Sequence, residues 1–200
     1  MATIIGEDGI ERCAWAGDAK ELADYHDAEW GLPVGDDQRL FEKLCLESFQ
    51  SGLSWRTILN KRPAFREAFA GFEVATVAQF DDGDVERLLA DASIVRNRQK
   101  IEATINNARR TVELQATGDT LARLLWSFEP SATELGEPQT MTTSPSSVAL
   151  AKDLRRRGWK FLGPTTLFSF MQAMGLLNDH AVGCFRRDAI DTARANFQRP

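Results

Sequence analysis

The amino-acid sequence predicts an all-α protein, and three observations support that fold class. Apolar residues recur at helical spacing in most segments; Leu40 and Leu44, for example, share one helix face. Glycine and proline residues lie where the expected helices begin and end. No stretch of alternating apolar and polar residues is long enough to predict a strand of useful length. With 200 residues, the chain can form one large domain or two small lobes that share a core.

The first third of the chain is expected to contain a short arm and two helices. Residues 1–10 show no periodic pattern and predict a flexible N-terminal arm. A helical segment follows and ends near Gly31, which opens a loop. Asp36 or Asp37 is placed to cap the next helix, which Gly52 ends.

The middle of the chain predicts two short helices and a helical hairpin. One short helix is expected to begin near Ser54, and Pro63 and Gly71 bracket another. Apolar residues at helical spacing then predict a helix over residues 84–92 and, after a connection over residues 93–97, a longer helix that runs to about Leu114. Because the connection between these two is short, they are expected to form a tight helical hairpin.

The last third is expected to hold two more helices. Residues 130–145, rich in Ser, Thr and Pro, predict a loop or a lobe boundary. Ser146 or Ser147 is placed to cap a helix that Gly158 ends, and Pro164 opens another helix. The expected organisation is therefore a flexible arm (1–10), a single domain of two helical lobes (11–184) and a C-terminal tail (185–200).

The composition excludes some classes of protein. The sequence contains no run of the ~18 apolar residues that a membrane span needs, and its start lacks the features of a signal peptide. We therefore expect a cytoplasmic protein whose cysteines are thiols or metal ligands rather than disulfide partners. The net charge of −5 counts against a protein that grips nucleic acid through phosphate neutralisation. Basic residues nevertheless cluster locally, at Arg96, Arg98 and Lys100, at Arg109 and Arg110, and at Arg155, Arg156, Arg157 and Lys160.

Two cysteines and two histidines form a candidate metal-ligand set. Cys13 and His26 lie near one end of the chain, and His180 and Cys184 lie near the other. The last two are one helical turn apart, so both can face one ion. Together the four residues supply a closed Cys2His2 set, which suits structural zinc and would join the two ends of the chain. The alternative is that these residues are scattered, since only the last pair is close in sequence.

Aromatic residues and one carboxylate form a second candidate site. Trp15, Tyr25, Trp30 and Trp55 all fall near the proposed metal ligands in the sequence, and Glu47 lies among them just before a predicted helix end. Aromatic walls with a carboxylate can bind a flat, electron-poor ring such as an alkylated purine through stacking and cation–π attraction. The alternative is that the aromatic side chains belong to the core and that Glu47 faces water.

The sequence contains five further motifs, Glu11–Trp15, Tyr25–Gly31, Leu46–Trp55, Arg157–Phe161 and Asn178–Cys184. In this order, and over about residues 11 to 184, they resemble the 3-methyladenine DNA glycosylase I family, a family of repair enzymes. The resemblance implies a helix-hairpin-helix glycosylase fold with a zinc site that joins the N- and C-terminal segments. The zinc ligands would be the four residues named above.

The resemblance also implies roles for individual residues. Glu47 would read the base, Trp55 would stack on it, and the other aromatic residues of the first third, Trp15, Tyr25 and Trp30, would line the pocket. Gln50 and Leu53 fall where family members wedge into the gap that the flipped base leaves. Backbone amides at the hairpin turn would hold DNA phosphate. The turn residues expected to contact DNA are Ser93, Arg96, Asn97 and Arg98.

The sequence departs from the family pattern in three places. A second pocket tyrosine of some members falls on Leu22, so one polar wall is expected to be missing. The usual glycine after the glutamate is Ser48, and the bulkier Phe49 follows it, which is expected to narrow the pocket. The hairpin turn lacks the usual glycines, which weakens the sequence evidence for phosphate binding there.

The expected reaction is hydrolysis of the N-glycosidic bond of 3-methyladenine in double-stranded alkylated DNA, which leaves an abasic site. 3-Methylguanine stays open as a further substrate. No lysine occupies a recognised nucleophile position, so we expect hydrolysis without strand cleavage, by a monomer. One alternative is a catalytically weak homologue that binds DNA or bases. Another is a zinc hydrolase, which four closing ligands disfavour.

Overall fold

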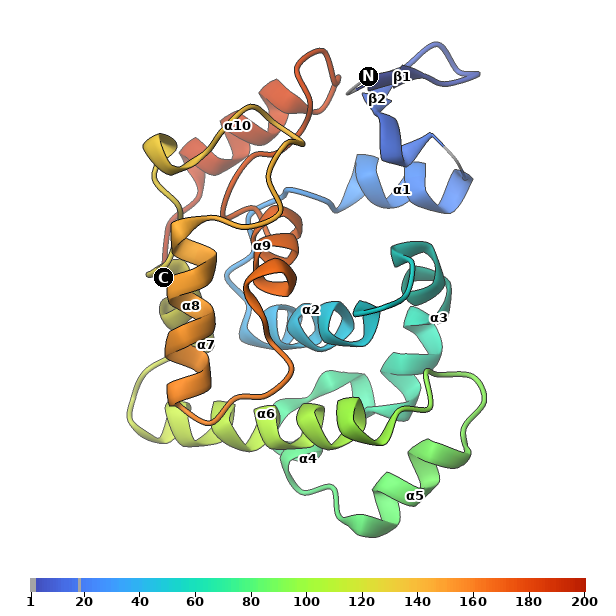
Figure 1. Cartoon of the computed structure of the whole chain (residues 1–200), viewed down its shortest axis with the longest axis vertical. Helices are drawn as coiled ribbons and strands as arrows, with labels where there is room; N and C mark the ends of the chain where they lie inside the picture. The colour runs from blue at the N-terminus through green and yellow to red at the C-terminus, as the bar shows by residue number, and fades with distance from the viewer. Residues whose placement is uncertain (1–2, 18) are drawn as a thin grey trace.

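The computed structural model describes residues 3–17 and 19–200 and shows a mainly helical protein (Figure 1). The all-α prediction is confirmed in its main point, because helices form most of the regular structure in the described residues. The short elements are strands β1 (Thr3–Ile5) and β2 (Glu11–Cys13) and the 3-10 helices η1 (Ala14–Ala16), η2 (Ala70–Phe72) and η3 (Ala132–Glu134). The α-helices are α1 (Lys20–Ala28), α2 (Asp37–Gln50), α3 (Trp55–Ala68), α4 (Val74–Ala78), α5 (Asp82–Ala90), α6 (Arg98–Ala116), α7 (Leu121–Trp126), α8 (Pro145–Arg156), α9 (Pro164–Ala173) and α10 (Arg187–Asn196).

Helix α2 lies at the centre of the molecule (Figure 1). Asp36 caps it by accepting a hydrogen bond from the backbone N of Arg39 at 2.9 Å, as predicted. Helices α3, α6, α7 and α9 all contact α2, so its side chains are buried on several sides. Even Lys43 and Glu47 are only 5% exposed. Because a buried charge is costly unless it is paired, both side chains need partners inside the protein.

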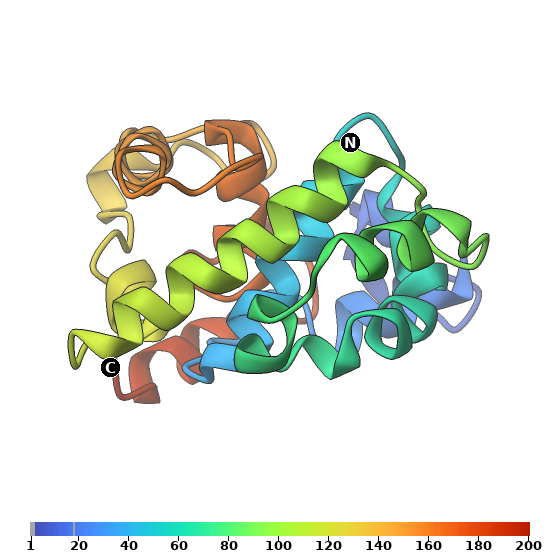
Figure 2. The ribbon, with the colours of Figure 1, turned by 90° about the horizontal axis from the view of Figure 1, so that it is seen from below.

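Helices α4, α5 and α6 lie at one end of the molecule, and β1, β2, α1 and α10 lie at the other (Figure 1). Both helices of the predicted hairpin are confirmed, and residues 91–97 connect them. Helix α5 begins earlier than expected because Asp81 caps it and forms a capping box with Asp84. Asn97 caps α6, which runs diagonally across the molecule when it is seen from below (Figure 2).

The prediction of two short helices around Pro63 is wrong, because α3 is one continuous helix with this proline inside it. Ser54 caps α3 as expected by accepting from the backbone N of Thr57. A proline inside a helix removes one backbone hydrogen bond. The helix persists because Ile58 and Phe65, on either side of the proline, are both fully buried in the same core.

One other helix boundary differs from the sequence prediction, and two short helices were not predicted. Helix α8 is capped by Ser144, two or three residues before the expected caps, because Pro145 fits the first helical position. Helices α4 and α7 are too short to show a clear period in the sequence. The loop predicted over residues 130–145 is largely confirmed; within it, η3 is the only helical turn before α8 among the described residues.

Both terminal segments are more ordered than the sequence predicts. In the described part of the predicted arm, β1 pairs antiparallel with β2, with Ile5 opposite Glu11; Met1 and Ala2 lie outside the described residues. The predicted C-terminal tail contains α10, where Ile190 is fully buried. Beyond α10, Phe197 packs on Trp126 with ring centroids 4.6 Å apart. The prediction failed here because strands of three residues, and a helix with one fully buried apolar residue, are too short or too polar to leave a periodic pattern.

Within the residues that the structure describes, no helix has the length and apolar character that a membrane crossing requires.

Candidate functional site

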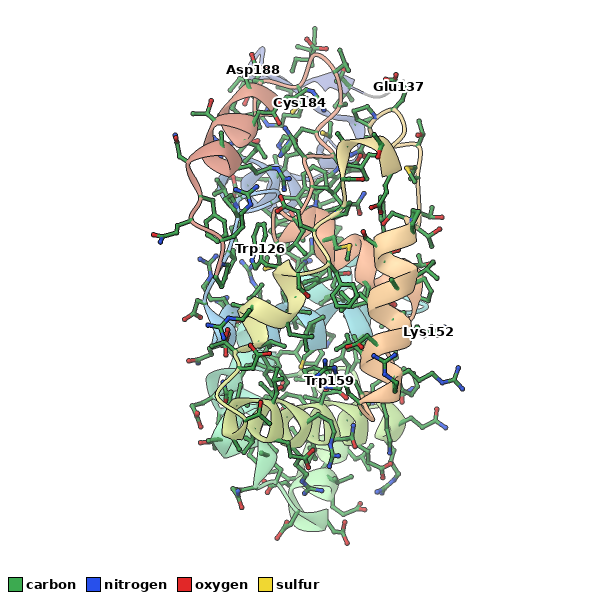
Figure 3. The ribbon with its side chains drawn as sticks, turned by 90° about the vertical axis from the view of Figure 1, so that its left-hand side faces the viewer. Trp126, Glu137, Lys152, Trp159, Cys184 and Asp188 are labelled. Atoms are coloured by element: carbon green, nitrogen blue, oxygen red, sulfur yellow. The ribbon has the colours of Figure 1, made fainter. Side chains whose placement is uncertain are left out.

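The two ends of the chain meet at a buried group of four potential metal ligands: Cys13 on β2, His26 on α1, and His180 and Cys184 before α10. Cys184 lies at the same end of the molecule as the N-terminal strands (Figure 3). The four ligand atoms all lie within 4.8 Å of one another. The Sγ of Cys184 is 3.4 Å from a ring nitrogen of each histidine, and the Sγ of Cys13 is 3.7 Å from Nδ1 of His180. Bonds of zinc-like length place tetrahedral ligands about 3.4–3.8 Å apart, so the group can hold a metal ion.

The histidine rings are oriented by contacts on their far sides. Nδ1 of His26 lies 2.8 Å from Oδ1 of Asp27, which also accepts hydrogen bonds from Arg12. Nε2 of His180 lies 3.1 Å from the carbonyl oxygen of Trp30. Each ring therefore presents its other nitrogen to the thiols, as metal-binding histidines commonly do.

Cys45 is the third cysteine and is not part of the metal-ligand group. Burial raises the pKa of its thiol, so Cys45 stays neutral inside the core.

A pocket of about 240 Å³ lies next to the metal-ligand group, and we call it the aromatic pocket. Its size is slightly below that of sites for drug-sized ligands, at about 300–1,000 Å³, and suits a small flat molecule. The structure brings together here every aromatic residue that the sequence predicted for the pocket, with Glu47 and Gln50. The lining residues are Trp15, Tyr25, Trp30, Lys43, Glu47, Gln50, Trp55, Gln139, Ser169 and Gln172.

The aromatic wall is continuous with the metal-ligand group. Trp15 and Trp30 pack edge to face with ring centroids 5.1 Å apart. The ring of His26 lies 5.4 Å from Trp15, and the ring of His180 lies 4.6 Å from Trp30. The positions of the two indoles therefore depend on the positions of the two histidines.

Lys43 is a site residue that the sequence pattern did not predict. Its Nζ lies 2.7 Å from Oε1 of Glu47, one turn later on α2, and donates to the Tyr25 hydroxyl at 2.9 Å. The same ammonium lies 3.4 Å from the centroid of the Trp55 ring. Burial lowers the pKa of Lys43, and the charge of Glu47 opposes that effect. Burial also raises the pKa of Tyr25 well above its usual value, and Glu47 adds to this. The four-residue spacing of Lys43 and Glu47 was the one available signal.

Two glutamines that line the aromatic pocket are held in place by hydrogen bonds to a buried aspartate. Oδ1 of Asp179 accepts from the backbone N of Gln139 at 3.0 Å, and Oδ2 accepts from Nε2 of Gln172 at 2.6 Å. Gln139 lies in the loop before α8 and Gln172 on α9. No local pattern links these segments, so the sequence could not predict that they meet.

Two further hollows follow one another outward from the aromatic pocket. The first, which we call the mouth, has a volume of about 250 Å³ and shares Glu47, Gln50 and Ser169 with the aromatic pocket. Ser51, Gly52 and Leu53 also line the mouth. The second, which we call the basic groove, has a volume of about 800 Å³ and shares Ser51 and Thr166 with the mouth. The basic groove is lined by Ser51, Val148, Ala151, Lys152, Arg155, Trp159, Lys160, Phe161, Leu162, Gly163, Pro164 and Thr166.

The residues predicted at the hairpin turn lie away from the aromatic pocket lining. The backbone N and the hydroxyl of Ser93 both donate to Asp91, and the side chain of Asn97 caps α6. Arg98 forms an ion pair with Glu86 at 2.5 Å. Arg96 is exposed at the turn.

The residues that depart from the family pattern do not narrow the pocket. Phe49 points into the core, where its ring lies 4.6 Å from that of Phe65, so the expected narrowing is wrong. Leu22 and Ser48 are buried and do not line the aromatic pocket.

Lys100 links the hairpin to the mouth. Its buried Nζ donates to the carbonyl oxygens of Phe49 at 2.9 Å and Ser51 at 2.6 Å, at the C-terminal end of α2.

Lys100→Met leaves both carbonyls without this donor, so we expect the free energy of unfolding to fall by about 1–3 kcal/mol. Lys61→Met is the matched control, because Lys61 also donates to two carbonyls, but in an exposed setting. Equal losses in the two variants, measured by urea unfolding, would contradict this role.

Comparison with known proteins shows close relatives over most of the chain. The chain is 44% identical over 179 residues to DNA-3-methyladenine glycosylase 1 of Escherichia coli K12, which covers 88% of this chain and 96% of the relative. A crystal structure of 3-methyladenine DNA glycosylase I superimposes with a TM-score of 0.83 at 44% identity and covers 87% of this chain and 98% of its own. A Staphylococcus aureus 3-methyladenine DNA glycosylase I, whose structure concerns 3-methyladenine recognition, gives 0.81 at 39% identity, with coverages of 88% and 96%.

A family comparison agrees with these relatives. The sequence profile of the methyladenine glycosylase family matches residues 15–187, which include the whole aromatic pocket and three of the four potential metal ligands. The chain belongs to the methyladenine glycosylase family.

Proposed function

We propose that this protein removes 3-methyladenine from alkylated DNA by hydrolysing the N-glycosidic bond and leaving an abasic site. The observation that carries the proposal is Glu47, a carboxylate held in the wall of an aromatic pocket in a member of this family. Action on double-stranded DNA, as a monomer in the cytoplasm, is part of the same proposal.

The chemistry follows from the charge of the damaged base. Methylation at N3 makes the attached purine cationic, so the C1′–N9 bond breaks with its electron pair moving to N9. The base leaves neutral, and water adds to C1′ and loses a proton. The protein has to expose the base and hold it while the sugar is cationic. Glu47 accepts hydrogen bonds from the base edge, and stacking on aromatic side chains contributes about 1–3 kcal/mol per base.

Exposure of the base requires groups that replace it in the duplex. Leu53 is 43% exposed beside the mouth, and Gln50 lies where the mouth joins the aromatic pocket. We propose that these two side chains fill the gap that the flipped base leaves. The α5–α6 pair would act as a helix-hairpin-helix element, with its turn near Arg96 against the DNA backbone.

We propose that the four metal ligands hold structural zinc. Two thiolates and two imidazoles complete a tetrahedral set, which suits zinc and leaves no position for a catalytic water. When bound, the ion would supply a rigid joint between the termini rather than a reactant. The chain's own contribution is that His26 and His180 then hold Trp15 and Trp30 in the pocket wall.

Incubation with methylated duplex DNA, followed by identification of the released bases, tests the proposed reaction. We expect free 3-methyladenine to appear together with abasic sites and with intact strands. Absence of any released base would favour the base-binding alternative. Strand breaks formed by the enzyme itself would show that the reaction is not simple hydrolysis.

The basic groove gives a prediction about DNA binding. Lys152 and Lys160 are exposed and line this groove, and Lys152 is on α8 (Figure 3). If both contact phosphate, Lys152→Gln with Lys160→Gln lowers the slope of log affinity against log salt by about 2. The change is measured by titrating duplex DNA at several salt concentrations. Lys20→Gln, an exposed lysine on α1, serves as the control and is expected to leave the slope unchanged. An unchanged slope in the double variant would remove the basic groove from the DNA interface.

A further inference from the structure

Phe161, in the loop between α8 and α9, has a strained backbone that core packing does not explain. Its φ angle is 58°, in the left-handed region that bulky residues rarely adopt. Phe72 has a similar φ of 57°, but its side chain is fully buried, so packing in the core compensates for the strain. Phe161, in contrast, is 42% exposed. A strained residue with an exposed side chain is a candidate for a functional contact.

Helix α6 holds the segment that carries Phe161. The buried side chain of Asn107 on α6 pairs twice with the backbone of Lys160. Its Nδ2 donates to the carbonyl oxygen of Lys160, and its Oδ1 accepts from the backbone N, both at 2.9 Å. Trp159, the residue before Lys160, is buried. The ring of Phe161 is therefore presented by a fixed segment and not by a loose loop.

The basic groove around Phe161 has the charge of a site for a polyanion. Lys152, Arg155 and Lys160 line the groove and are exposed, and none of its lining residues that the structure describes is an acid. The whole protein, in contrast, has a net charge of −5. The groove therefore complements a chain of phosphates.

The basic groove also offers a surface on which a base can stack. Phe161 belongs to its lining, next to the apolar residues Val148, Leu162 and Pro164. A cationic groove with an exposed aromatic side chain is the arrangement by which proteins bind unpaired nucleotides. In an intact duplex the faces of the bases are covered by their neighbours, so contacts to phosphate alone would not need an aromatic ring.

The basic groove is continuous with the place where a base would leave the duplex. The groove shares Ser51 and Thr166 with the mouth, and the mouth shares Glu47 and Gln50 with the aromatic pocket. Extrusion of one nucleotide removes a stacking partner from its neighbours. A neighbouring nucleotide is then free to enter the groove, whose volume of about 800 Å³ exceeds the 240 Å³ of the aromatic pocket.

We propose that the basic groove is a second binding site, separate from the aromatic pocket, for one unpaired nucleotide beside the extruded one, whose base stacks on Phe161. Lys152, Arg155 and Lys160 contact the phosphates of that nucleotide. The inference rests on the proposed function, because it takes DNA as the ligand. The strained backbone is retained because it presents the ring of Phe161 as the stacking surface.

Binding of undamaged DNA by the full chain tests this site without the base-release reaction. The probes are a fluorescein-labelled oligothymidine of about twenty nucleotides and an intact duplex of the same length, both followed by anisotropy. We expect Phe161→Ala to weaken binding of the single strand by about tenfold, as the loss of one base–aromatic stack does. Binding of the duplex should change by less than about twofold, because its base faces are covered.

Two further variants serve as controls for this measurement. Phe161→Tyr keeps the aromatic ring and should bind both probes as the wild type does. Ile5→Ala removes an exposed apolar side chain from β1 and should leave both affinities unchanged.

Phe161→Gly separates the contact from the folding of the loop. Glycine adopts a positive φ without strain, so we expect Phe161→Gly to have a higher Tm than Phe161→Ala. Both variants should nevertheless lose the same affinity for the single strand. If the loss of affinity instead follows the loss of Tm, Phe161 has only a structural role and the inference is overturned.

The other failures are distinguishable. Equal losses on the two probes, or unchanged binding of the single strand by Phe161→Ala, overturn the stacking role. Failure of the wild-type protein to bind oligothymidine overturns the second site and leaves the glycosylase proposal intact, because release of 3-methyladenine tests that proposal separately. Absence of base release from methylated DNA, together with the expected binding of oligothymidine, overturns the proposed reaction and supports the groove as a nucleotide site.

Discussion

Glu47→Gln is expected to lower kcat/KM for release of 3-methyladenine by about 10²–10³-fold, the cost of removing one hydrogen-bonding group that acts on a developing charge. The amide has nearly the same shape as the carboxylate, so the aromatic wall should keep its form. The amide is neutral, so its oxygen is a weaker acceptor for the base than a carboxylate oxygen. Its NH2 group donates where the second carboxylate oxygen accepted. Single-turnover release of bases from methylated DNA measures the effect.

Loss of folding must be separated from loss of chemistry, because Glu47→Gln leaves Lys43 buried without a counter-charge. Adding Lys43→Met to the same protein removes the unpaired ammonium, so the double variant should regain stability without regaining activity. Glu42→Gln is the matched control on the same helix, since Glu42 is paired with Arg66 at 2.8 Å and does not line the aromatic pocket. Activity within a few-fold of wild type in a folded Glu47→Gln protein would refute the role of Glu47.

Much of the site could be predicted because its residues have rare and specific chemistry. Cys13 and His180 are 167 positions apart, so their closeness in space could not be predicted from closeness in sequence. Their residue types allowed the prediction instead, because cysteine and histidine are the side chains that form closed structural metal sites. Glu47 was singled out because it lies among the aromatic residues of the first third, just before a predicted helix end.

Lys43 could not be recognised in the same way. A lysine on a helix usually extends into solvent, and only the packing of other helices around α2 buries this one. Burial then turns an ordinary four-residue spacing into an ion pair inside the aromatic pocket. Gln139 and Gln172 were missed for a related reason, since both are placed by Asp179 and not by any local pattern.

Helix boundaries failed where tertiary contacts outweighed local preference. Pro63 signals a helix start in the sequence, but buried residues on both sides hold α3 together as one helix. Helix α10 offers one fully buried apolar residue, Ile190, which is too little for a periodic pattern to reveal. These errors concern where helices begin and end. They did not affect the prediction of which residues line the pocket.

Removal of the metal is expected to have the largest effect on stability. The wild-type chain should contain one zinc ion, and Cys184→Ser should reduce the metal content to a small fraction of that. Structural zinc contributes several kcal/mol to folding. A loss of about 4 kcal/mol lowers Tm by about 8–16 °C in a protein of this size. Metal analysis and thermal unfolding measure the two quantities.

Cys45→Ser is the control for Cys184→Ser. Cys45 is equally buried but lies outside the metal-ligand group, so its replacement should lower Tm moderately and leave the metal content unchanged. Wild-type metal content in the Cys184→Ser protein would remove Cys184 from the ligand set.

The metal should also matter to base binding, although no step of the reaction passes through it. His26 and His180 contact Trp15 and Trp30, so histidines that lose their ion allow these indoles to move. Chelation at a temperature where the protein stays folded should therefore weaken binding of free 3-methyladenine, and added zinc should restore it. Unchanged binding in a folded, metal-free protein would show that the core packing of Trp30, which is 7% exposed, suffices to hold the wall without the ion.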